Sequence, residues 1–531
     1  MKLSLKVKSL VATATLVGAV IATAPAHAAA VGPVCDKAVP IQKCVGTTSD
    51  GAPYVMVVPA NFNGTVALYS HGYRFNVPVA ALGYPAVLNT PEPAPGGDAA
   101  VMNYFLSNGM AIMGSGFARQ GWNADSAIAT NAELIDTFKK TFTTTTKVLA
   151  WGSSLGGVIT QGLAEKYPNL VSAVAPLCMA DNVAPEVTMA GDFLWGIKAF
   201  FDPTIKGGNY SAGAAGVTEA MIDLGKITAV LTALKGGIAS GAWPATSSPA
   251  GKALEAAGVP SRSALLLLGL MTGIPTQSAH FDGVSGGTSF ALAASPALAV
   301  LENGATAAAL GVFISLDVED QAGGVVYDNS KTDYAARVAE ESVVYSAALS
   351  GNTAIQGMLA VLKATPRVTA NPTAAAKFAS LHKNTGKINV PTILMVGVAD
   401  PVTPAGATQR LVDLYEEQYA SERAAAIAEA KKSQIYSAPA KKLLAIWSTT
   451  PASYTTFDAA GSPITTEPAA PGTNHCNFTS AQYVAVAKIM VQASKDGYVT
   501  ASGANRNIIR RAKNLKYDPY FTPSLLKYYN S

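Results

Sequence analysis

Charge is scarce in this sequence. Only 14% of its 531 residues are Asp, Glu, Lys or Arg, against about 25% in an average globular protein. The 38 basic and 34 acidic residues nearly balance, and a nucleic-acid partner needs a clustered basic face. The one basic stretch, residues 506–516, is short and is expected to be solvated surface. Nucleic acid is therefore not an expected partner, whereas 49% hydrophobic residues exclude disorder and require a core.

Several functional motifs are also missing. The chain has no G-x-x-x-x-G-K-[ST] phosphate loop, no H-E-x-x-H and no paired C-x-x-C. Gly114-x-Gly116 lacks the third glycine at the Rossmann spacing. Histidine is rare, with five residues dispersed along the chain. We therefore expect no metal site and no cofactor.

Long hydrophobic runs are few, and the first lies at the N-terminus. Within residues 1–28, three lysines precede an apolar stretch, residues 10–24, and the triplet Ala-His-Ala ends at Ala28. This pattern predicts a signal peptide cleaved after Ala28, and hence a secreted or periplasmic protein of net charge about +1. A membrane anchor is the alternative, but the run is shorter than the roughly 20 residues that span a bilayer. Downstream, residues 264–271 form the most apolar piece and are too short, so no transmembrane segment is expected in the mature chain.

Cysteine is limited to four residues. In an oxidising compartment an even number usually pairs, and four cysteines allow three connectivities. A local bridge between Cys35 and Cys44 is the simplest choice, and it leaves Cys178 with Cys476. The alternative is that Cys178 is a buried free thiol.

Strand patterns alternate with helical patterns over two parts of the chain, which predicts an α/β fold with a parallel sheet and helices on both faces. The Asn-Gly turn at residues 61–64 indicates a hairpin between the first two strands. The expected strands are 54–60, 65–70, 111–113, 147–151, 171–177, 392–398 and 443–447, and the expected helices are 125–142, 156–167, 408–432 and 480–495.

The alternation stops between the two parts. Residues 179–389, here named the cap segment, offer helical stretches such as 217–234 and 332–348 but no persuasive series of strands. A structureless loop of this size would be implausible in a compact domain, so we interpret the segment as a mainly helical cap or lid inserted into one fold. The expected division is signal peptide 1–28, first core part 29–178, cap segment 179–389, and second core part with tail 390–531.

The most informative motif is Gly152-Ser153-Ser154-Leu155-Gly156. It matches G-x-S-x-G, follows an expected strand and opens an expected helix. Such a tight turn needs small residues on either side so that the serine Oγ is pushed outward. We therefore predict Ser154 as a nucleophile; the alternative is a Gly-rich turn capped by serine.

A serine nucleophile needs a base, usually histidine, held by a carboxylate. His475 precedes the last substantial helix, whereas His280 lies in the cap segment and His382 in a polar stretch without anchoring context. The chain order Ser, acid, His selects His475 as the base.

The acid should follow a late strand. Asp400 comes directly after the strand 392–398 and before Pro401, and a carboxylate at that strand end faces the crevice where such sheets do their chemistry. A loop aspartate that caps the next helix is the alternative. Asp317 and Asp320 are less favoured because both belong to the cap segment.

An acyl-transfer oxyanion needs fixed donors. The first expected donor is the backbone N–H of Leu155, the residue after the nucleophile. The second is the N–H of Tyr73, in a loop where His71 shapes the chain and Gly72 permits the sharp turn.

At these residues the chain resembles the α/β-hydrolase superfamily, in particular secreted bacterial serine esterases and lipases. The resemblance rests on His71-Gly72 and on Ser154, Asp400 and His475 in the family order, and covers roughly residues 45–178 and 390–500. The run Gly121-Trp122-Asn123 is also similar to some of these secreted hydrolases. The family implies an eight-stranded, mostly parallel sheet with the triad at its C-terminal edge. The single glycine after His71 departs from the Gly-rich oxyanion loop of many lipases and favours smaller or acyl-chain substrates.

The expectation from the sequence is a secreted serine hydrolase that cleaves small or polymeric carboxylic esters, of acyl, aryl or hydroxyalkanoate type, through an acyl-enzyme. A bridge from Cys178 to Cys476 would tie the histidine loop to the sheet edge. Two alternatives stay open: a serine peptidase or aminopeptidase of the same fold, and a catalytically silent envelope binding protein. The sequence says nothing of oligomeric state.

Overall fold

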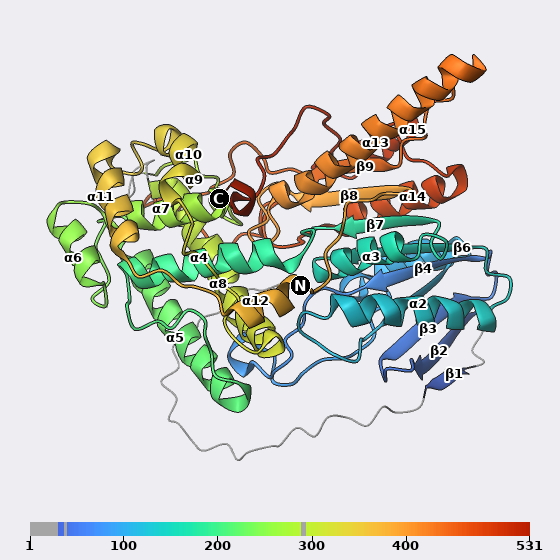
Figure 1. Ribbon diagram of the computed structural model, residues 1–531, viewed down its shortest axis with the longest axis horizontal. Helices are drawn as coiled ribbons and strands as arrows, with labels where there is room; N and C mark the ends of the chain where they lie inside the picture. Colours follow the sequence, from blue (N-terminus) through green and yellow to red (C-terminus); the bar gives the residue numbers. More distant parts are fainter. Residues whose placement is uncertain (1–29, 37–39, 288–293, 531) are drawn as a thin grey trace.

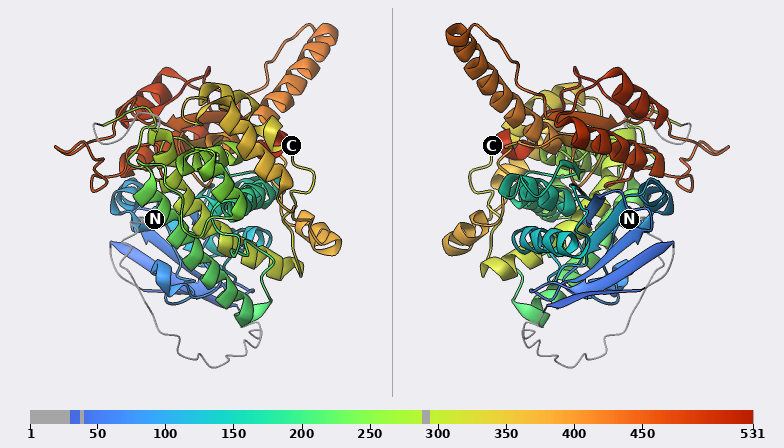
Figure 2. Two further views of the ribbon diagram at one scale, coloured as in Figure 1. Left: turned by 90° about the vertical axis from the view of Figure 1, so that its left-hand side faces the viewer. Right: turned by 90° about the vertical axis from the view of Figure 1, so that its right-hand side faces the viewer.

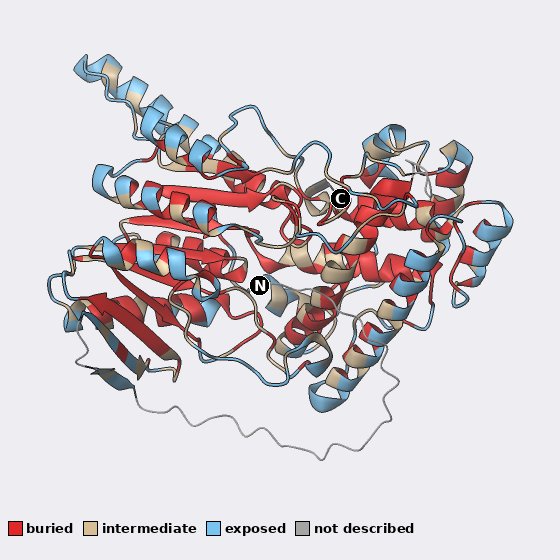
Figure 3. Cartoon of the chain, turned by 180° about the vertical axis from the view of Figure 1, so that it is seen from behind, coloured by how far each residue is buried: buried red, intermediate tan, exposed pale blue. Residues whose placement is uncertain are grey.

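The computed structural model describes residues 30–36, 40–287 and 294–530 (Figure 1). The signal peptide expected at residues 1–28 lies outside these ranges. One end of the molecule is built around a β-sheet, and the other end is built of helices (Figure 1). Burial is greatest along the strands, and the outer part of one long helix near the C-terminus is exposed to solvent (Figure 3).

The sheet has ten strands in the described part of the chain, in the order β1-β2-β3-β5-β4-β6-β7-β8-β9-β10. The six strands from β5 to β9 in this order run parallel, and β1, β2, β3 and β10 add antiparallel edges. This confirms the predicted α/β class with a mostly parallel sheet. The strands are β1 (Val31–Cys35), β2 (Ile41–Thr47), β3 (Pro53–Pro59), β4 (Thr65–Ser70), β5 (Ala111–Ser115), β6 (Lys147–Ser153), β7 (Ala173–Leu177), β8 (Thr392–Gly397), β9 (Leu443–Ser448) and β10 (Leu515–Lys516).

Helices cover both faces of the sheet because its central strands are apolar on both sides. In β6, Leu149 and Trp151 pack with α1 (Ala99–Ser107) and α14 (Ser480–Asp496). Val148 and Ala150 face α2 (Ala124–Thr141) and α3 (Leu155–Lys166) on the other side. The remaining helices of this part are α13 (Ala405–Ser433) and α15 (Gly503–Arg511), with short 3-10 turns at Ala80–Leu82, Pro95–Gly97 and Lys527–Asn530.

The predicted hairpin between the first two expected strands is wrong. β3 pairs with β2 and β5, and β4 pairs with β5 and β6. The turn that joins β3 to β4 instead bonds the turns that precede β5 and β6: Asn63 N–H donates to the Gly109 carbonyl at 2.7 Å, and the Gly64 carbonyl accepts from Thr146 N–H at 2.8 Å. These bonds align the start of β4 with the starts of β5 and β6. The Asn-Gly turn therefore helps to set the register of the parallel strands.

The sheet is also larger than the eight strands implied by the resemblance. The extra strands lie at its edges: β1 is joined to β2 by the Cys35–Cys44 disulfide, and β10 pairs with β9. The stretch 506–516, expected as solvated surface, contributes the end of α15 and β10, with Ile509 and Leu515 buried.

Between β7 and β8 the described residues of the cap segment form helices and no strand. The stretch 332–348, expected as one helix, is two short ones, α9 and α10, because Val338 leaves the helical conformation between them. The helices are α4 (Val183–Phe200), α5 (Gly213–Gly237), α6 (Pro249–Ala256), α7 (Ser261–Thr272), α8 (Ser295–Ala322), α9 (Tyr334–Arg337), α10 (Ala339–Val344), α11 (Gly351–Ala364) and α12 (Pro372–Ala379).

Helix α8 is long and apolar, with a mean hydropathy of 1.6 over an 18-residue stretch. The apolar piece expected from the sequence, residues 264–271, lies in the shorter helix α7, whereas α8 is the longer apolar helix. Two thirds of the α8 stretch, 67%, is buried inside the molecule, and α4, α5 and α7 pack against it. Its hydrophobicity therefore fits a central helix of the cap segment.

Two further views show how the parts are arranged (Figure 2). Helix α13 begins beside β8, where Leu411 and Tyr415 are buried, and its second half projects away from the body of the molecule. The carboxyl ends of the parallel strands point toward the cap segment (Figure 1). Side chains at those strand ends therefore lie between the sheet and the cap segment.

Candidate active site

Ser154 occupies a strained turn between β6 and α3. Its φ of 60° is unusual for a residue with a side chain. A Cβ on Gly156 would lie 2.0 Å from the Ser70 carbonyl oxygen, and one on Gly152 would lie 2.3 Å from the Gly156 carbonyl oxygen. Only glycine fits at both positions, which is the steric reason for the G-x-S-x-G pattern.

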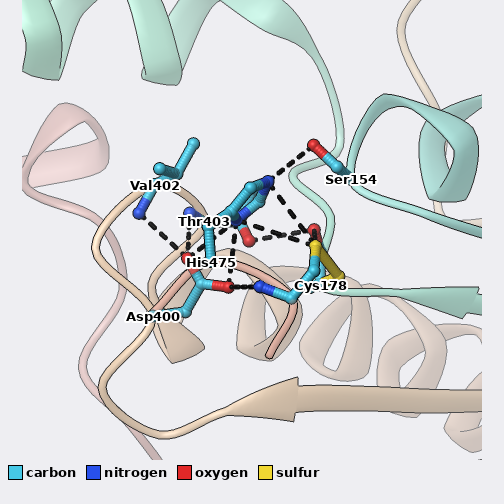
Figure 4. The surroundings of a disulfide bond; sticks show 7 residues. Ser154, Cys178, Asp400, Val402, Thr403 and His475 are labelled. Atoms are coloured by element: carbon cyan, nitrogen blue, oxygen red, sulfur yellow. Dashed lines mark hydrogen bonds and ion pairs between the residues drawn. A yellow bond between two sulfur atoms is a disulfide. The ribbon is translucent and has the colours of Figure 1, made fainter. Parts of the chain in front are cut away.

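The hydroxyl of Ser154 meets the imidazole of His475 (Figure 4). Ser154 Oγ lies 2.7 Å from His475 Nε2. On the other side of the ring, Nδ1 lies 3.0 and 3.1 Å from the two carboxylate oxygens of Asp400. The three predicted residues, of which Ser154 and His475 are 321 positions apart and Asp400 and His475 are 75 apart, thus form one continuous line of hydrogen bonds.

Asp400 is fully buried and held by backbone donors. Its Oδ1 accepts from the N–H groups of Val402 and Thr403, each at 2.9 Å, and its Oδ2 accepts from Cys476 N–H at 2.9 Å. These bonds compensate the carboxylate for its loss of water. These bonds also orient the carboxylate toward His475. When Nε2 carries no proton, the Nδ1–H of His475 donates to Asp400.

A disulfide joins Cys178, directly after β7, to Cys476, the neighbour of His475 (Figure 4). Cys476 Sγ lies 3.5 Å from His475 Nε2. Thr403 Oγ1 donates to the Cys178 carbonyl at 2.9 Å, so the aspartate loop is tied to the same strand end. The bridge therefore fastens the loop that carries His475 to the centre of the sheet, and Cys178 is not a free thiol.

The loop after β4 lies against the nucleophile. A Cβ on Gly72 would lie 3.1 Å from Ser154 Cβ, so the backbone of this loop comes close to the serine at Gly72. Tyr73 is held at its far end, where its hydroxyl donates to the Phe313 carbonyl of α8 at 3.3 Å. The N–H of Leu155 opens helix α3, where the first backbone donors have no partner within the helix. Oxyanion binding by Leu155 and Tyr73 remains a prediction.

His71 is buried beside this loop and packs on Phe117, with ring centroids 4.7 Å apart. Burial, with a smaller contribution from nearby Arg74, lowers the pKa of His71 to about 3. The ring is therefore neutral at ordinary pH and its Nδ1 lies 2.8 Å from the Gly72 carbonyl. These contacts fit the shaping role predicted for His71.

The remaining histidines have other partners. His280 lies 2.5 Å from Glu302 and 2.9 Å from the Glu467 carbonyl. His382 Nε2 lies 2.8 Å from Asn384 Oδ1, and its ring sits against Gly162 of α3. Neither histidine has a hydrogen bond to Ser154.

The alternative aspartates are also accounted for. Asp317, in α8, accepts from Arg119 and from Trp122 N–H in the loop between β5 and α2. A Cβ on Gly121 would lie 2.4 Å from Asp317 Oδ2, so the Gly-Trp pair noted in the sequence is a docking point for the cap segment. Asp320 is exposed.

Two residues near the site escaped the sequence reading. Thr403 bonds both Asp400 and Cys178, and Glu186, in the first turn of α4, is a carboxyl among apolar residues beside the Asp400 loop. The only sequence signal for Glu186 is an acidic residue in a largely apolar helix, which also contains Asp192. The only sequence signal for Thr403 is that it follows Asp400 by three residues.

Among the described residues, Asp400, His475 and Cys476 bring metal-ligand atom types within 4.8 Å of one another. The Cys476 sulfur is bonded to Cys178, so it is not a thiolate ligand. His475 Nδ1 and Asp400 are bonded to each other. In the structure these atoms therefore have partners within the protein, namely a disulfide for Cys476 and a hydrogen bond between His475 and Asp400.

Comparison with known proteins finds no matching family model and no matching curated protein. Solved structures show distant likeness. Feruloyl esterase B from Aspergillus oryzae is 14% identical, with 86% of this chain and 81% of that chain covered at a TM-score of 0.37. The rice cell wall degrading esterase LipA from Xanthomonas oryzae is 12% identical, with 71% and 80% covered at a TM-score of 0.28. At such TM-scores these likenesses assign neither family nor activity.

Proposed function

We propose that the protein is a serine hydrolase of carboxylic esters. Ser154 Oγ attacks the ester carbonyl while His475 Nε2 accepts its proton, and Asp400 orients and stabilises the imidazolium. The N–H groups of Leu155 and Tyr73 bind the oxyanion. His475 then returns the proton to the leaving alcohol, and a water activated by the same histidine releases the acyl group.

One observation carries this proposal: the unbroken hydrogen-bond line from Ser154 through His475 to a buried Asp400, at 2.7 and 3.0 Å. A serine hydroxyl is a weak nucleophile unless such a base is within reach. The ester substrate class is favoured because the walls contributed by α4 and α8 are largely apolar.

We also propose that the mature protein starts after Ala28 and works outside the cytoplasm. Its two disulfides are typical of proteins that fold in an oxidising compartment. N-terminal sequencing of the exported protein tests the cleavage position, and an intact residue 1–28 segment would contradict it.

The activity is tested with a fluorophosphonate probe and a panel of aryl esters of increasing acyl length. We expect stoichiometric labelling of wild type, none of Ser154→Ala, and a loss of about 10⁶-fold in kcat for that variant. Ser153→Ala is the matched control, since it removes the neighbouring hydroxyl, which faces Tyr69 and Tyr483 rather than His475, and it should keep labelling and activity.

Aminoacyl arylamides assayed beside the esters separate a peptidase from an esterase. Faster cleavage of the amides would contradict the proposed ester preference. Absence of any Ser154 adduct in folded wild type would instead favour a silent binding protein.

A further inference from the structure

A narrow hollow lies between the cap segment and the loop that carries Asp400. Its walls come from α4, α8 and residues 401–402. It encloses about 430 Å³ of unoccupied space including its mouth, of which only about 30 Å³ admits the centre of a water molecule. A slender aliphatic group fits such a slot better than a ring does.

The hollow borders the catalytic residues on the side away from the nucleophile. Val402 lines it and donates its N–H to Asp400 at 2.9 Å. In Figure 4, Val402 and Ser154 lie on opposite sides of His475. A substrate whose ester bond lies at Ser154 and whose chain extends past His475 would place the end of that chain in the hollow.

Glu186 is the one titratable residue that lines the hollow. The other walls are apolar side chains, such as Met189, Phe193 and Leu310. Glu186 Oε1 is buried and has no hydrogen-bond partner within the described residues. Proteins seldom leave a buried polar atom without a partner, because that loses a hydrogen bond the atom makes in water. An unpaired carboxyl in an apolar slot is therefore suited to a ligand that supplies the missing partner.

The charge state of Glu186 decides which partner that is. Burial is the main cause that raises its pKa well above the usual value, and the carboxylates of Asp400 and Asp181 add to it. Both of those carboxylates have their own donors: Asp400 has three backbone N–H groups, and Asp181 has the Tyr529 hydroxyl and the Asn182 amide. Burial therefore favours the neutral acid form of Glu186, which can donate a hydrogen bond to an acceptor oxygen.

A cationic amine is the competing ligand. It would require Glu186 to ionise, which burial and the nearby carboxylates of Asp400 and Asp181 both oppose. An acceptor oxygen carries no such penalty.

We propose that the hollow is a substrate subsite, and that Glu186 sets specificity there by donating a hydrogen bond to a hydroxyl or carbonyl oxygen on an aliphatic part of the ester. This rests on the proposed esterase function and names its substrate class: esters with a second oxygen function on a slender chain, rather than plain alkyl esters.

The test compares matched substrates. One set is p-nitrophenyl hexanoates that carry hydrogen, hydroxyl, oxo or amino substituents at carbon 3 or 5; the other is hexyl acetates with the same substituents on the alcohol. Wild type should prefer an oxygen-bearing member of at least one set by about tenfold in kcat/KM. Glu186→Gln keeps size and donor and should keep most of this preference, whereas Glu186→Leu should abolish it and leave the plain ester within about threefold of wild type.

A second variant reaches the hollow from its other wall. Ala307→Phe, on α8, should fill the slot and also abolish the preference while Glu186 is intact. The ratio between two substrates is the readout, because a merely structural role of Glu186 would change both rates together.

Three results would overturn the subsite: no preference in wild type, a preference that survives both Glu186→Leu and Ala307→Phe, or a preference for the amino member that Glu186→Gln removes. Fluorophosphonate labelling of Ser154 in every variant distinguishes failure of the subsite proposal from failure of the esterase proposal. Intact labelling without preference rejects the subsite alone, and absent labelling in wild type rejects the esterase.

Discussion

Asp400, the acid of the proposed triad, shows how burial constrains a single side chain. Three backbone N–H groups and His475 all donate to its carboxylate. If an amide NH₂ replaces one oxygen, a donor faces these donors and the hydrogen bonds to that oxygen are lost. We expect Asp400→Asn to lower kcat by about 10³- to 10⁴-fold, since the amide favours the wrong tautomer of His475. The rate should be measured per fluorophosphonate-titrated site, which removes any effect of misfolded enzyme. A loss below about tenfold would contradict the assigned role of Asp400.

His71 makes the stability of the protein depend on pH. In the folded protein the pKa of His71 is about 3, below the usual 6.5. Between these two pH values His71 is protonated in the unfolded chain and neutral in the folded protein. Stability from this residue is complete above pH 6.5 and is lost as pH falls toward 3. At pH 5 the loss is about 2 kcal/mol.

The variant His71→Gln cannot titrate and isolates this effect. Urea unfolding at pH 7.5 and pH 5 should show a free-energy drop about 2 kcal/mol smaller in His71→Gln than in wild type. Equal drops in both proteins would mean that His71 is protonated in the fold.

At the scale of elements, the turn from β6 to α3 depends on glycine for space rather than for flexibility. We expect Gly156→Ala to destabilise by at least about 2 kcal/mol, because its Cβ would lie 2.0 Å from the Ser70 carbonyl oxygen. Gly225→Ala is the control: that glycine lies exposed inside helix α5, and a Cβ there meets nothing within 4 Å. The control should gain up to about 1 kcal/mol. Thermal and urea unfolding would measure both, and like signs would contradict the steric account.

The two disulfides close loops of very different size. Cys178 and Cys476 are 298 residues apart, and Cys35 and Cys44 are 9 apart. Loop entropy therefore gives the first bridge about 5 to 6 kcal/mol and the second about 3 kcal/mol at most. Cys178→Ser with Cys476→Ser should lower both stability and kcat, because His475 loses its anchor.

Cys35→Ser with Cys44→Ser is the matched control, and its kcat should stay at the wild-type value because β1 and β2 lie at the far edge of the sheet. Activity and unfolding are measured on all three proteins. An unchanged kcat in the Cys178, Cys476 pair variant would mean that the bridge does not position the histidine.

Features whose sequence signal lies within a few neighbouring residues could be predicted, whereas features that depend on distant parts of the chain could not. The G-x-S-x-G turn at residues 152–156 and the apolar strand at 392–398 carry their signals within a few residues, so the turn at Ser154 and the position of Asp400 after a strand could be inferred. The pairing of β3 could not, because its neighbour β5 comes after β4 in the chain and only the whole sheet decides the order. Short edge strands such as β10, with two residues, have no pattern to detect.

At the scale of the molecule, the cap segment contacts the core through specific polar groups. Asp317 of α8 is fully buried and accepts hydrogen bonds from Asn76, Arg119 and Trp122 N–H, all from loops after β4 and β5. Tyr73 adds its bond to the Phe313 carbonyl. None of these partners is close to Asp317 in sequence, which is why a sequence reading treats Asp317 only as a spare acid. The contacts couple the position of α8, and of the hollow it lines, to the loop that carries the expected oxyanion donor.

Removing Asp317 should therefore affect stability and substrate binding together. Asp317→Ala leaves Arg119 and Trp122 N–H without their acceptor, and we expect a loss of about 2 to 3 kcal/mol. This loss of stability is smaller than the loss on breaking a fully buried ion pair, because the Arg119 side chain is 39% exposed and water can solvate it. The triad sits on the core, so kcat/KM for an acetyl ester should change by less than about threefold, whereas esters long enough to touch α8 should lose about tenfold or more. Glu429→Ala, in an exposed pair with Lys432 on α13, should change neither stability nor specificity measurably. Equal losses for short and long esters would show that Asp317 supports the fold without shaping the substrate site, and that the cap segment takes no part in binding.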